Sequence, residues 1–399
     1  MSPRFLCRLV SLLVVGLLPS AAAAETLVYF GTYTRPAVPP ATLQSEGIYV
    51  ATLDANGQLG EPRLAARAQH PSYLALHPEG TMLYAVGEVA DFATEPSSQA
   101  TNRRRQRGSG GVVAFRIEAD GTLTETGREA TGGGGACHLS LTPDARTLLV
   151  ANYGGGSVAS FALDENGGLG ERVSFHQHVG GSGVNERRQQ EPHAHAFRSV
   201  SDSLAYAPDL GQDRLKAYLV VGSTLQPAES LDAICPPGGG PRHLAVAPGG
   251  RFLVSNMELT SQLVSFELLE GERPRQVTVA STLPDDADPQ LPAVANNSTA
   301  ECLFHPSGRF VFVSNRGHNS IASFVFDAQD GQLSKIGVFP AGVDTPRGMG
   351  VTPDGRYLIA CGQRDDTVVV HAITDDGRLE PHGSPIQIGV PVNAVVLQR

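Results

Sequence analysis

The chain has 399 residues and a formal net charge of −10, with 45 glycines, 28 prolines and no tryptophan. The negative charge argues against a nucleic-acid partner, although a local group of arginines could still bind an anion. The many glycines and prolines, without low-complexity sequence, favour many turns and therefore many short strands.

Residues 1–24 have the pattern of a secretory signal peptide. Arg4 and Arg8 precede an apolar run over 9–18, and Ala22–Ala24 forms a small-residue cleavage site. The apolar run is short for a membrane span, and no later segment approaches that length. We therefore predict a mature protein of residues 25–399 that is exported, to the periplasm or outside the cell, and is not membrane-bound after cleavage.

One phrase recurs along the rest of the chain and indicates a structural repeat. A turn of the Pro-x-Gly type is followed by an apolar strand in copies that begin at His77, Thr142, Ala247, His305 and Thr352, with a degenerate copy at Ser199. Each copy follows one short strand and precedes another that ends in a hairpin signal such as Asp-Gly. Three or four antiparallel strands repeated about every 50 residues are typical of a β-propeller.

The count of copies predicts seven blades. Six copies are visible, and the seventh blade needs strands from both ends of the chain. Residues 392–397 have the pattern of an inner strand with nothing after it, and residues 27–33 that of a second strand with nothing before it. Pairing them closes the ring and removes exposed sheet edges. We therefore expect an all-β fold, a single seven-bladed propeller of four-stranded antiparallel blades over residues 25–399, closed by the terminal strands.

Two segments depart from the repeat. Residues 91–110 are polar and basic, and we interpret them as a flexible, solvated loop within the first full blade. Residues 283–299 are acidic at their start and form the long connection into a later blade.

The cysteines of the mature chain are widely spaced and include no Cys-x-x-Cys pair, so a zinc site is not indicated. They are Cys137, Cys235, Cys302 and Cys361. The apolar sequence around them favours buried strand positions. Export would permit disulfides, and the sequence leaves their pairing open.

Polar residues occur where each inner strand is expected to begin. In a propeller these strands line the central channel, and ligands bind at such mouths. The positions hold Ser72, His138, His193 with His195, Arg242 with His243, Glu301, Arg347 and Asn393. The ends of the second strands add Glu88, Tyr153, Glu258, Arg316 and His318. A buried channel arginine needs a carboxylate partner, and Glu301 is the nearest candidate by strand adjacency. Either these residues form a site, or they only pair across blades and stabilise the ring.

The stretch 187–195 is the densest in ionisable groups. Pro192 biases Glu191 to an extended backbone, in which His193 and His195 point to the same side. Arginines suit a carboxylate, a phosphate or the oxyanion of a lactone carbonyl, and a nearby His or Glu can act as general base. The sequence has no Gly-x-Ser-x-Gly elbow and no P-loop, which argues against a serine hydrolase or a phosphate cradle. No matched carboxylate cluster supports a metal at the two histidines.

Five motifs together resemble the seven-bladed propeller lactonase family, which includes the propeller type of 6-phosphogluconolactonase and fungal 3-carboxy-cis,cis-muconate lactonising enzyme. They are YFGTYT at 29–34, ANYGGGSV at 151–158, EPHAH at 191–195, GPRH at 240–243 and SNRGH at 314–318. The resemblance covers about Leu27 to Leu397. It implies opening or closing of a lactone ring without a metal, by a His, two Arg and a Glu on the channel face. The positions that match are His138, Arg188, Glu191 and Arg242, and the histidine pair at 193 and 195 is a further family feature.

These observations predict a monomeric lactonase, resembling 6-phosphogluconolactonase, that needs no cofactor and hydrolyses a small anionic sugar lactone. Arg188 and Arg242 would hold the negative group or the oxyanion, and Glu191 or His138 would transfer the proton. The expected substrate-binding residues are His193, His195, His243, Glu301, Arg316, His318 and Arg347. Two alternatives stay open: a lactonising cycloisomerase acting on carboxymuconates, and an exported propeller that binds a ligand or protein without catalysis.

Overall fold

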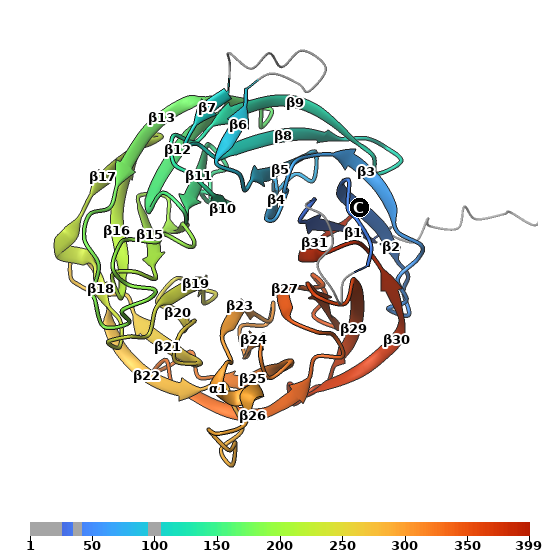
Figure 1. Ribbon diagram of the computed structural model, residues 1–399, viewed down its shortest axis with the longest axis vertical. Coiled ribbons are helices and arrows are strands. Elements are labelled where there is room, and N and C mark those ends of the chain that lie inside the picture. The colour runs from blue at the N-terminus through green and yellow to red at the C-terminus, as the bar shows by residue number, and fades with distance from the viewer. Residues whose placement is uncertain (1–25, 35–41, 95–104) are drawn as a thin grey trace, which may run out of the picture.

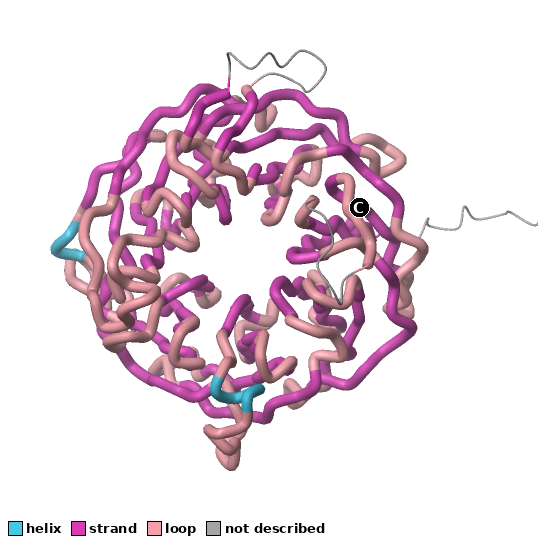
Figure 2. Tube along the Cα trace, viewed as in Figure 1, coloured by secondary structure: helices cyan, strands magenta, loops and turns pink. Residues whose placement is uncertain are grey.

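The computed structural model describes residues 26–34, 42–94 and 105–399, which form a ring of β-sheets around a central channel (Figure 1). The predicted signal peptide at 1–24 lies outside the described residues. Four strands run from the channel to the rim in each blade, and strands dominate the whole ring in Figure 2. The prediction of a seven-bladed, all-β propeller is confirmed.

The strands of each blade follow one another outward in chain order. The first complete blade holds β4 (Leu74–Leu76), β5 (Met82–Gly87), β8 (Gly111–Ile117) and β9 (Leu123–Ala130). The next holds β10 (Ala136–Leu141), β11 (Thr147–Asn152), β12 (Ser157–Leu163) and β13 (Leu169–Gln177). The third holds β14 (Arg198–Ser201), β15 (Leu204–Asp209), β16 (Arg214–Val221) and β17 (Thr224–Pro227), with β18 (Ala233–Ile234) also paired to β16.

The other half of the ring repeats this order. The fourth blade holds β19 (Pro241–Val246), β20 (Phe252–Met257), β21 (Gln262–Glu267) and β22 (Arg275–Ser281). The fifth holds β23 (Thr299–Phe304), β24 (Phe310–Asn315), β25 (Ser320–Phe326) and β26 (Leu333–Pro340). The sixth holds β27 (Pro346–Val351), β28 (Tyr357–Gly362), β29 (Thr367–Ile373) and β30 (Leu379–Gln387). Short helices occur at η1 (Glu229–Leu231) and α1 (Pro292–Ala295).

The last blade joins the two ends of the chain, as predicted. Its inner strand is β31 (Pro391–Gln398), followed outward by β1 (Thr26–Thr32), β2 (Gly47–Leu53) and β3 (Arg63–Arg67). Strand β31 pairs antiparallel with β1, from Thr26 opposite Gln398 to Phe30 opposite Ala394. The backbone hydrogen bonds of these two strands therefore hold the ring shut (Figure 1).

The expectation of an unstructured loop over 91–110 was wrong at both of its ends. Strands β6 (Asp91–Ala93) and β7 (Arg105–Arg107) pair antiparallel and form a two-stranded ribbon between β5 and β8. The buried Phe92 packs into a core cluster, which fixes the ribbon to its blade. A local charge count could not predict this, because the pairing depends on two short segments that are separated in the sequence.

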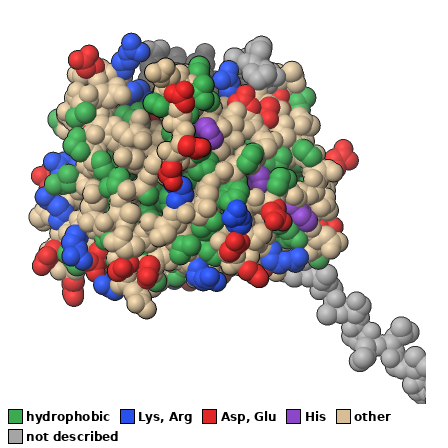
Figure 3. Space-filling model, turned by 90° about the horizontal axis from the view of Figure 1, so that it is seen from below, with side chains coloured by type: hydrophobic (Ala, Val, Ile, Leu, Met, Phe, Trp, Pro, Cys, Tyr) green, Lys and Arg blue, Asp and Glu red, His purple; other side chains and the backbone are tan. Residues whose placement is uncertain are grey.

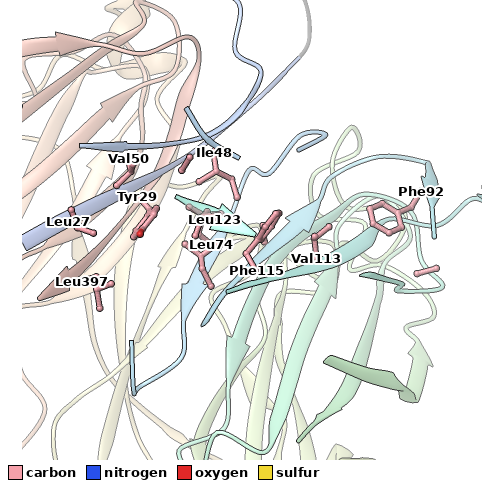
Figure 4. Packing of buried hydrophobic residues seen from close by; sticks show 14 residues of the cluster. Leu27, Tyr29, Ile48, Val50, Leu74, Phe92, Val113, Phe115, Leu123 and Leu397 are labelled. Atoms are coloured by element: carbon pink, nitrogen blue, oxygen red, sulfur yellow. The ribbon is translucent and has the colours of Figure 1, made fainter. Parts of the chain in front are cut away.

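The hydrophobic core lies between neighbouring blades. Figure 4 shows side chains of the closing blade and the first complete blade meeting in one cluster: Leu27, Tyr29, Ile48, Val50, Leu74, Phe92, Val113, Phe115, Leu123 and Leu397. The Tyr29 hydroxyl donates to Gly121 O at 3.0 Å, and Tyr84 makes the same contact one blade further on, to Gly167 O at 2.6 Å. Apolar residues thus hold the blades together, and the channel is left to the side chains of the inner strands.

The four cysteines are free and buried, so the pairing that the sequence left open does not occur. Acidic and basic side chains are interspersed over the rim seen in Figure 3. No helix among the described residues has the length and apolar character needed to cross a membrane.

Candidate active site at the channel mouth

Glu258, directly after β20, is the centre of a cluster of arginines. Its carboxylate lies 2.9 Å from Arg188 Nη2, 3.2 Å from Arg242 Nε and 3.2 Å from Arg316 Nη2. Burial alone would raise the pKa of Glu258, but the three guanidiniums outweigh it and lower that pKa to about 2. The carboxylate is therefore ionised at neutral pH and holds three cations in fixed positions.

The three arginines lie at different depths. The side chains of Arg188, Arg316 and Arg242 are 39%, 15% and 3% exposed, respectively. Arg188 also donates to the Tyr153 hydroxyl at 2.8 Å, and Arg242 donates to Ala300 O. Arg188 can therefore meet a ligand at the surface, while Arg242 presents a fixed guanidinium in a water-poor environment, where electrostatic interactions are stronger.

The loop that carries Arg188 is held by two buried polar side chains. Gln189 donates to Asp213 Oδ1 at 2.6 Å and to Leu210 O at 2.8 Å. Asp209, at the end of β15, accepts the backbone N–H of His193 at 2.9 Å. These contacts explain how a stretch without regular secondary structure can position a side chain for a site.

A second cluster joins three blades across the mouth. Arg347 in β27 donates to the Tyr33 hydroxyl at 3.0 Å, and Tyr33 donates to Glu88 Oε2 at 2.8 Å. The Arg347 guanidinium also lies over the Tyr33 ring, 5.5 Å from its centroid. Ser72 donates to the same Glu88 oxygen. Burial raises the pKa of Tyr33 above its ordinary value, so the phenol keeps its proton and can bridge the two charges.

Beneath the arginines lies a layer of aromatic rings, which we call the histidine layer: Tyr73, His138, His195 and His243. The His243 ring centroid is 5.3 Å from that of His138 and 5.4 Å from that of His195, and the Tyr73 ring lies tilted against His138 with the centroids 4.3 Å apart. Burial lowers the pKa of all three imidazoles well below the ordinary value. The layer therefore offers polar atoms without adding positive charge to the nearby arginines.

One carboxylate, Glu301 in β23, contacts this layer. Its Oε1 lies 2.7 Å from His243 Nδ1, and Arg242 Nη1 lies 3.2 Å from His243 Nε2. Burial raises the pKa of Glu301 to about 7. With Glu301 ionised, His243 Nδ1–H donates to it and the Nε2 lone pair accepts from Arg242. A carboxylate that titrates near neutral pH is suited to proton transfer.

In His138 the proton is on the other ring nitrogen from that in His243. The backbone N–H of Phe197 donates to His138 Nδ1 at 3.3 Å. Since this imidazole is neutral, its proton is then on Nε2, and that nitrogen is a donor. The arrangement favours a hydrogen-bond donor at His138 over a general base.

A small space lies between Arg242 of the first cluster and Arg347 of the second. It has a volume of ≈10 Å³, about that of one water molecule. Its walls are Ser72, Tyr73, Glu88, Cys137, Arg242, His243, Glu301, Arg347 and Val392. A water or a single carbonyl oxygen fits there, so the rest of a larger ligand has to remain outside this space.

Most of the predicted site residues come together at this mouth. Arg188, Arg242 and Arg316 share Glu258, and His138, His195, His243 and Glu301 form or contact the histidine layer. His193 stacks on Tyr153 at 4.6 Å, and His195 meets the same ring at 5.0 Å. The two histidines therefore lie on one side of the chain, as the extended backbone predicts.

Two predicted residues lie apart from these clusters. The Glu191 side chain is exposed, and in the described part of the chain no hydrogen bond or ion pair joins it to Arg188 or Arg242. His318 Nδ1 lies 2.8 Å from Ser320 Oγ, in the turn after β24. The expectation that Glu301 pairs with the channel arginine was also wrong, because Glu258 takes that place.

The sequence prediction did not assign roles to Glu258, Glu88, Tyr33 or Tyr73. Glu258 directly follows the second strand of its blade, as Glu88 follows β5 and Tyr33 follows β1. Arg316 follows β24 in the same way. The sequence prediction already uses the position after the second strand to name Glu88, Glu258 and Arg316, and the same position after β1 identifies Tyr33.

Within residues 26–34, 42–94 and 105–399, no group of three or more His, Cys, Asp or Glu side chains is arranged to hold a metal ion.

Comparisons with known proteins agree with this architecture. The family model described as "Lactonase, 7-bladed beta-propeller" matches residues 27–396. The 6-phosphogluconolactonase of Bacillus subtilis (strain 168) is 32% identical over 370 residues, which cover 91% of this chain and 96% of the relative. The 6-phosphogluconolactonase of Formosa agariphila is 27% identical, with 82% and 89% covered. The structure of the Pseudomonas aeruginosa periplasmic gluconolactonase PpgL superposes with a TM-score of 0.81 at 27% identity, with 94% and 99% covered.

Proposed function

The chain belongs to the seven-bladed β-propeller lactonase family, and we propose that it hydrolyses a small anionic sugar lactone at the channel mouth. The observation that supports this proposal best is the excess of positive charge there. Arg188, Arg242, Arg316 and Arg347 bring four cations, against the two carboxylates that contact them, Glu258 and Glu88 through Tyr33. A substrate with a carboxylate or phosphate would offset this excess. The name of the Bacillus subtilis relative points to the same class of substrate.

Arg242 is our candidate for the group that stabilises the oxyanion. Water adds to the lactone carbonyl carbon, the carbonyl oxygen becomes negative, and the ring C–O bond then breaks to give a hydroxy acid. Arg242 is buried and held by Glu258, Ala300 O and His243, so its guanidinium needs no reorganisation as the charge develops. Arg188 is more exposed and would hold the anionic substituent.

We propose Glu301, acting through or beside His243, as the base that takes the proton from water. Its support is its position on the wall of the water-sized space and a pKa of about 7. The earlier candidates are less suited, since Glu191 is exposed and the His138 ring has its available proton on Nε2. The leaving ring oxygen would recover the proton from the same pair.

A neutral aldonolactone is the second candidate substrate. The Pseudomonas aeruginosa relative is named a periplasmic gluconolactonase, and the pattern of residues 1–24 predicts export of this chain. We propose that the protein works outside the cytoplasm, and export is the feature that favours this second candidate.

The test is a panel of lactones offered to the protein of residues 25–399. It includes 6-phosphogluconolactone, glucono-δ-lactone and a carboxymuconolactone, and acid release is followed with and without a chelator. We expect 6-phosphogluconolactone to show a kcat/KM at least tenfold above that of glucono-δ-lactone, and Arg188→Gln to remove this preference. Arg187→Gln is the matched control, because that neighbouring side chain is exposed.

Equal rates for both lactones, unchanged by Arg188→Gln, would overturn the anionic substrate in favour of the neutral one. Loss of activity with chelator would overturn a metal-free reaction. No turnover of any lactone would favour the binding propeller.

A further inference from the structure

A second, larger cavity lies on the other side of the histidine layer. Its volume is ≈600 Å³, against ≈10 Å³ for the space at the mouth. It is lined by the later residues of the inner strands and the turns after them, so it opens toward the opposite end of the channel. Tyr73 and Glu301 line both spaces and therefore separate them. A cavity of this size is within the range that holds small organic ligands.

Arg198, the first residue of β14, supplies the positive charge of this cavity. Its guanidinium lies near the Tyr73 hydroxyl, and its Nε is buried and has no hydrogen-bond partner. No carboxylate in the described part of the chain lies within ion-pair distance of it. The guanidinium therefore has no counter-ion in contact with it, and a bound anion would offset its charge.

The rest of the wall is mainly apolar. Leu76, Leu141, Val246, Phe304, Val351 and Val396 line it, each half-buried at the end of its inner strand. A hydrocarbon chain would gain from burial against these side chains. The cavity thus combines one half-buried arginine at its inner end with a mainly apolar passage to solvent.

We propose that this cavity is a second ligand site that binds a small amphipathic carboxylate, with the carboxylate on Arg198 and the hydrocarbon chain along the ends of the inner strands. The site is separate from the lactone site and does not depend on the function proposed for it. A single guanidinium pairs with one carboxylate, and its Nη groups can donate hydrogen bonds to that carboxylate. The ligand's carboxylate would lie near Arg198 and away from Glu301, because an ionised Glu301 is negative and would repel it.

The first experiment measures binding of octanoate by calorimetry. We expect saturable 1:1 binding that is at least tenfold tighter than that of octan-1-ol, which has the same chain without the charge. Arg198→Met should weaken octanoate binding at least tenfold. Arg146→Met is the matched control, since Arg146 is an exposed arginine in the turn after β10, and it should leave binding unchanged.

A second measurement does not depend on changing Arg198. The chain contains no tryptophan, so Phe304→Trp places a single tryptophan on the cavity wall. Octanoate should change its fluorescence along the same saturation curve. No saturable binding, equal affinity for octan-1-ol, or octanoate binding that persists in Arg198→Met would overturn the proposal. Loss of octanoate binding in Arg188→Gln would also overturn it, because the ligand would then occupy the channel mouth.

Discussion

Replacing Glu258 with Gln should destabilise the protein at neutral pH. The carboxylate lies within 2.9–3.2 Å of three guanidiniums, and the amide keeps the shape while removing the charge. The pKa of Glu258 falls from 4.5 to about 2 on folding, a difference that corresponds to about 3 kcal/mol at neutral pH. Losses of this size are usual when one partner of a buried ion pair is removed.

The loss should depend on pH in a defined direction. Because the folded-state pKa is lowered, the stability contributed by Glu258 is fully present above pH 4.5 and disappears as the pH falls through about 2. The difference in unfolding free energy between wild type and Glu258→Gln should therefore be ~3 kcal/mol at pH 7 and only ~1 kcal/mol at pH 3. Urea denaturation at the two pH values measures both, with equal m-values as the check that the same surface unfolds.

Arg67→Gln is a suitable control, because Arg67 forms an exposed ion pair with Glu46, and exposed pairs contribute ~0–1 kcal/mol. A loss for Glu258→Gln below 1 kcal/mol at pH 7, or an equal loss at pH 3 and pH 7, would refute the reasoning. The burial of the carboxylate would then cancel its attraction to the arginines.

Three further results are expected. Glu301→Gln should lower kcat/KM roughly a hundredfold and abolish the rise of kcat/KM with pH through about 7, where the Glu301 carboxylate ionises. Glu191→Gln should change kcat/KM less than threefold, and the reverse order of the two effects would restore Glu191 as the base. Arg242→Lys should lower kcat by a hundredfold or more, since an ammonium cannot reproduce the guanidinium contacts, and a rate near wild type would exclude Arg242 as the oxyanion group. Deleting residues 391–399 removes β31 and should yield aggregated protein by light scattering, while a monomeric, cooperatively unfolding product would contradict closure through that strand.

The fold could be predicted because its signals are local. Each turn phrase and each hairpin signal lies within a few residues of the strands it connects, and the two unpaired terminal segments left one way to complete the ring. The ribbon of β6 and β7 could not be predicted in this way. Its strands are short and carry no periodic pattern, and its anchor is the packing of Phe92 against other segments of the blade.

The site could be predicted as a set of positions but not as a set of pairs. The repeat correctly brought Arg242, Glu301 and Arg316 to one mouth, because equivalent positions of successive blades lie on one circle. Which carboxylate meets which arginine depends on side-chain direction, and Glu258 and Glu301 both reach the mouth. Glu191, predicted to transfer the proton, has an exposed side chain. Closeness in sequence within an irregular loop says little about where a side chain points.

The charge balance of the mouth bears on whether its ionisable residues form a site or only stabilise the ring. A network that only stabilises would approach equal numbers of cations and anions, since an unpaired buried charge destabilises the fold. Here three arginines contact Glu258, and a fourth, Arg347, reaches Glu88 only through Tyr33. The third carboxylate, Glu301, has a pKa of about 7 and faces a neutral histidine. Burial keeps the three histidines uncharged, which limits the excess but does not remove it. The interblade core supplies the stability that holds these cations together, and an anionic substrate is the component that would balance them.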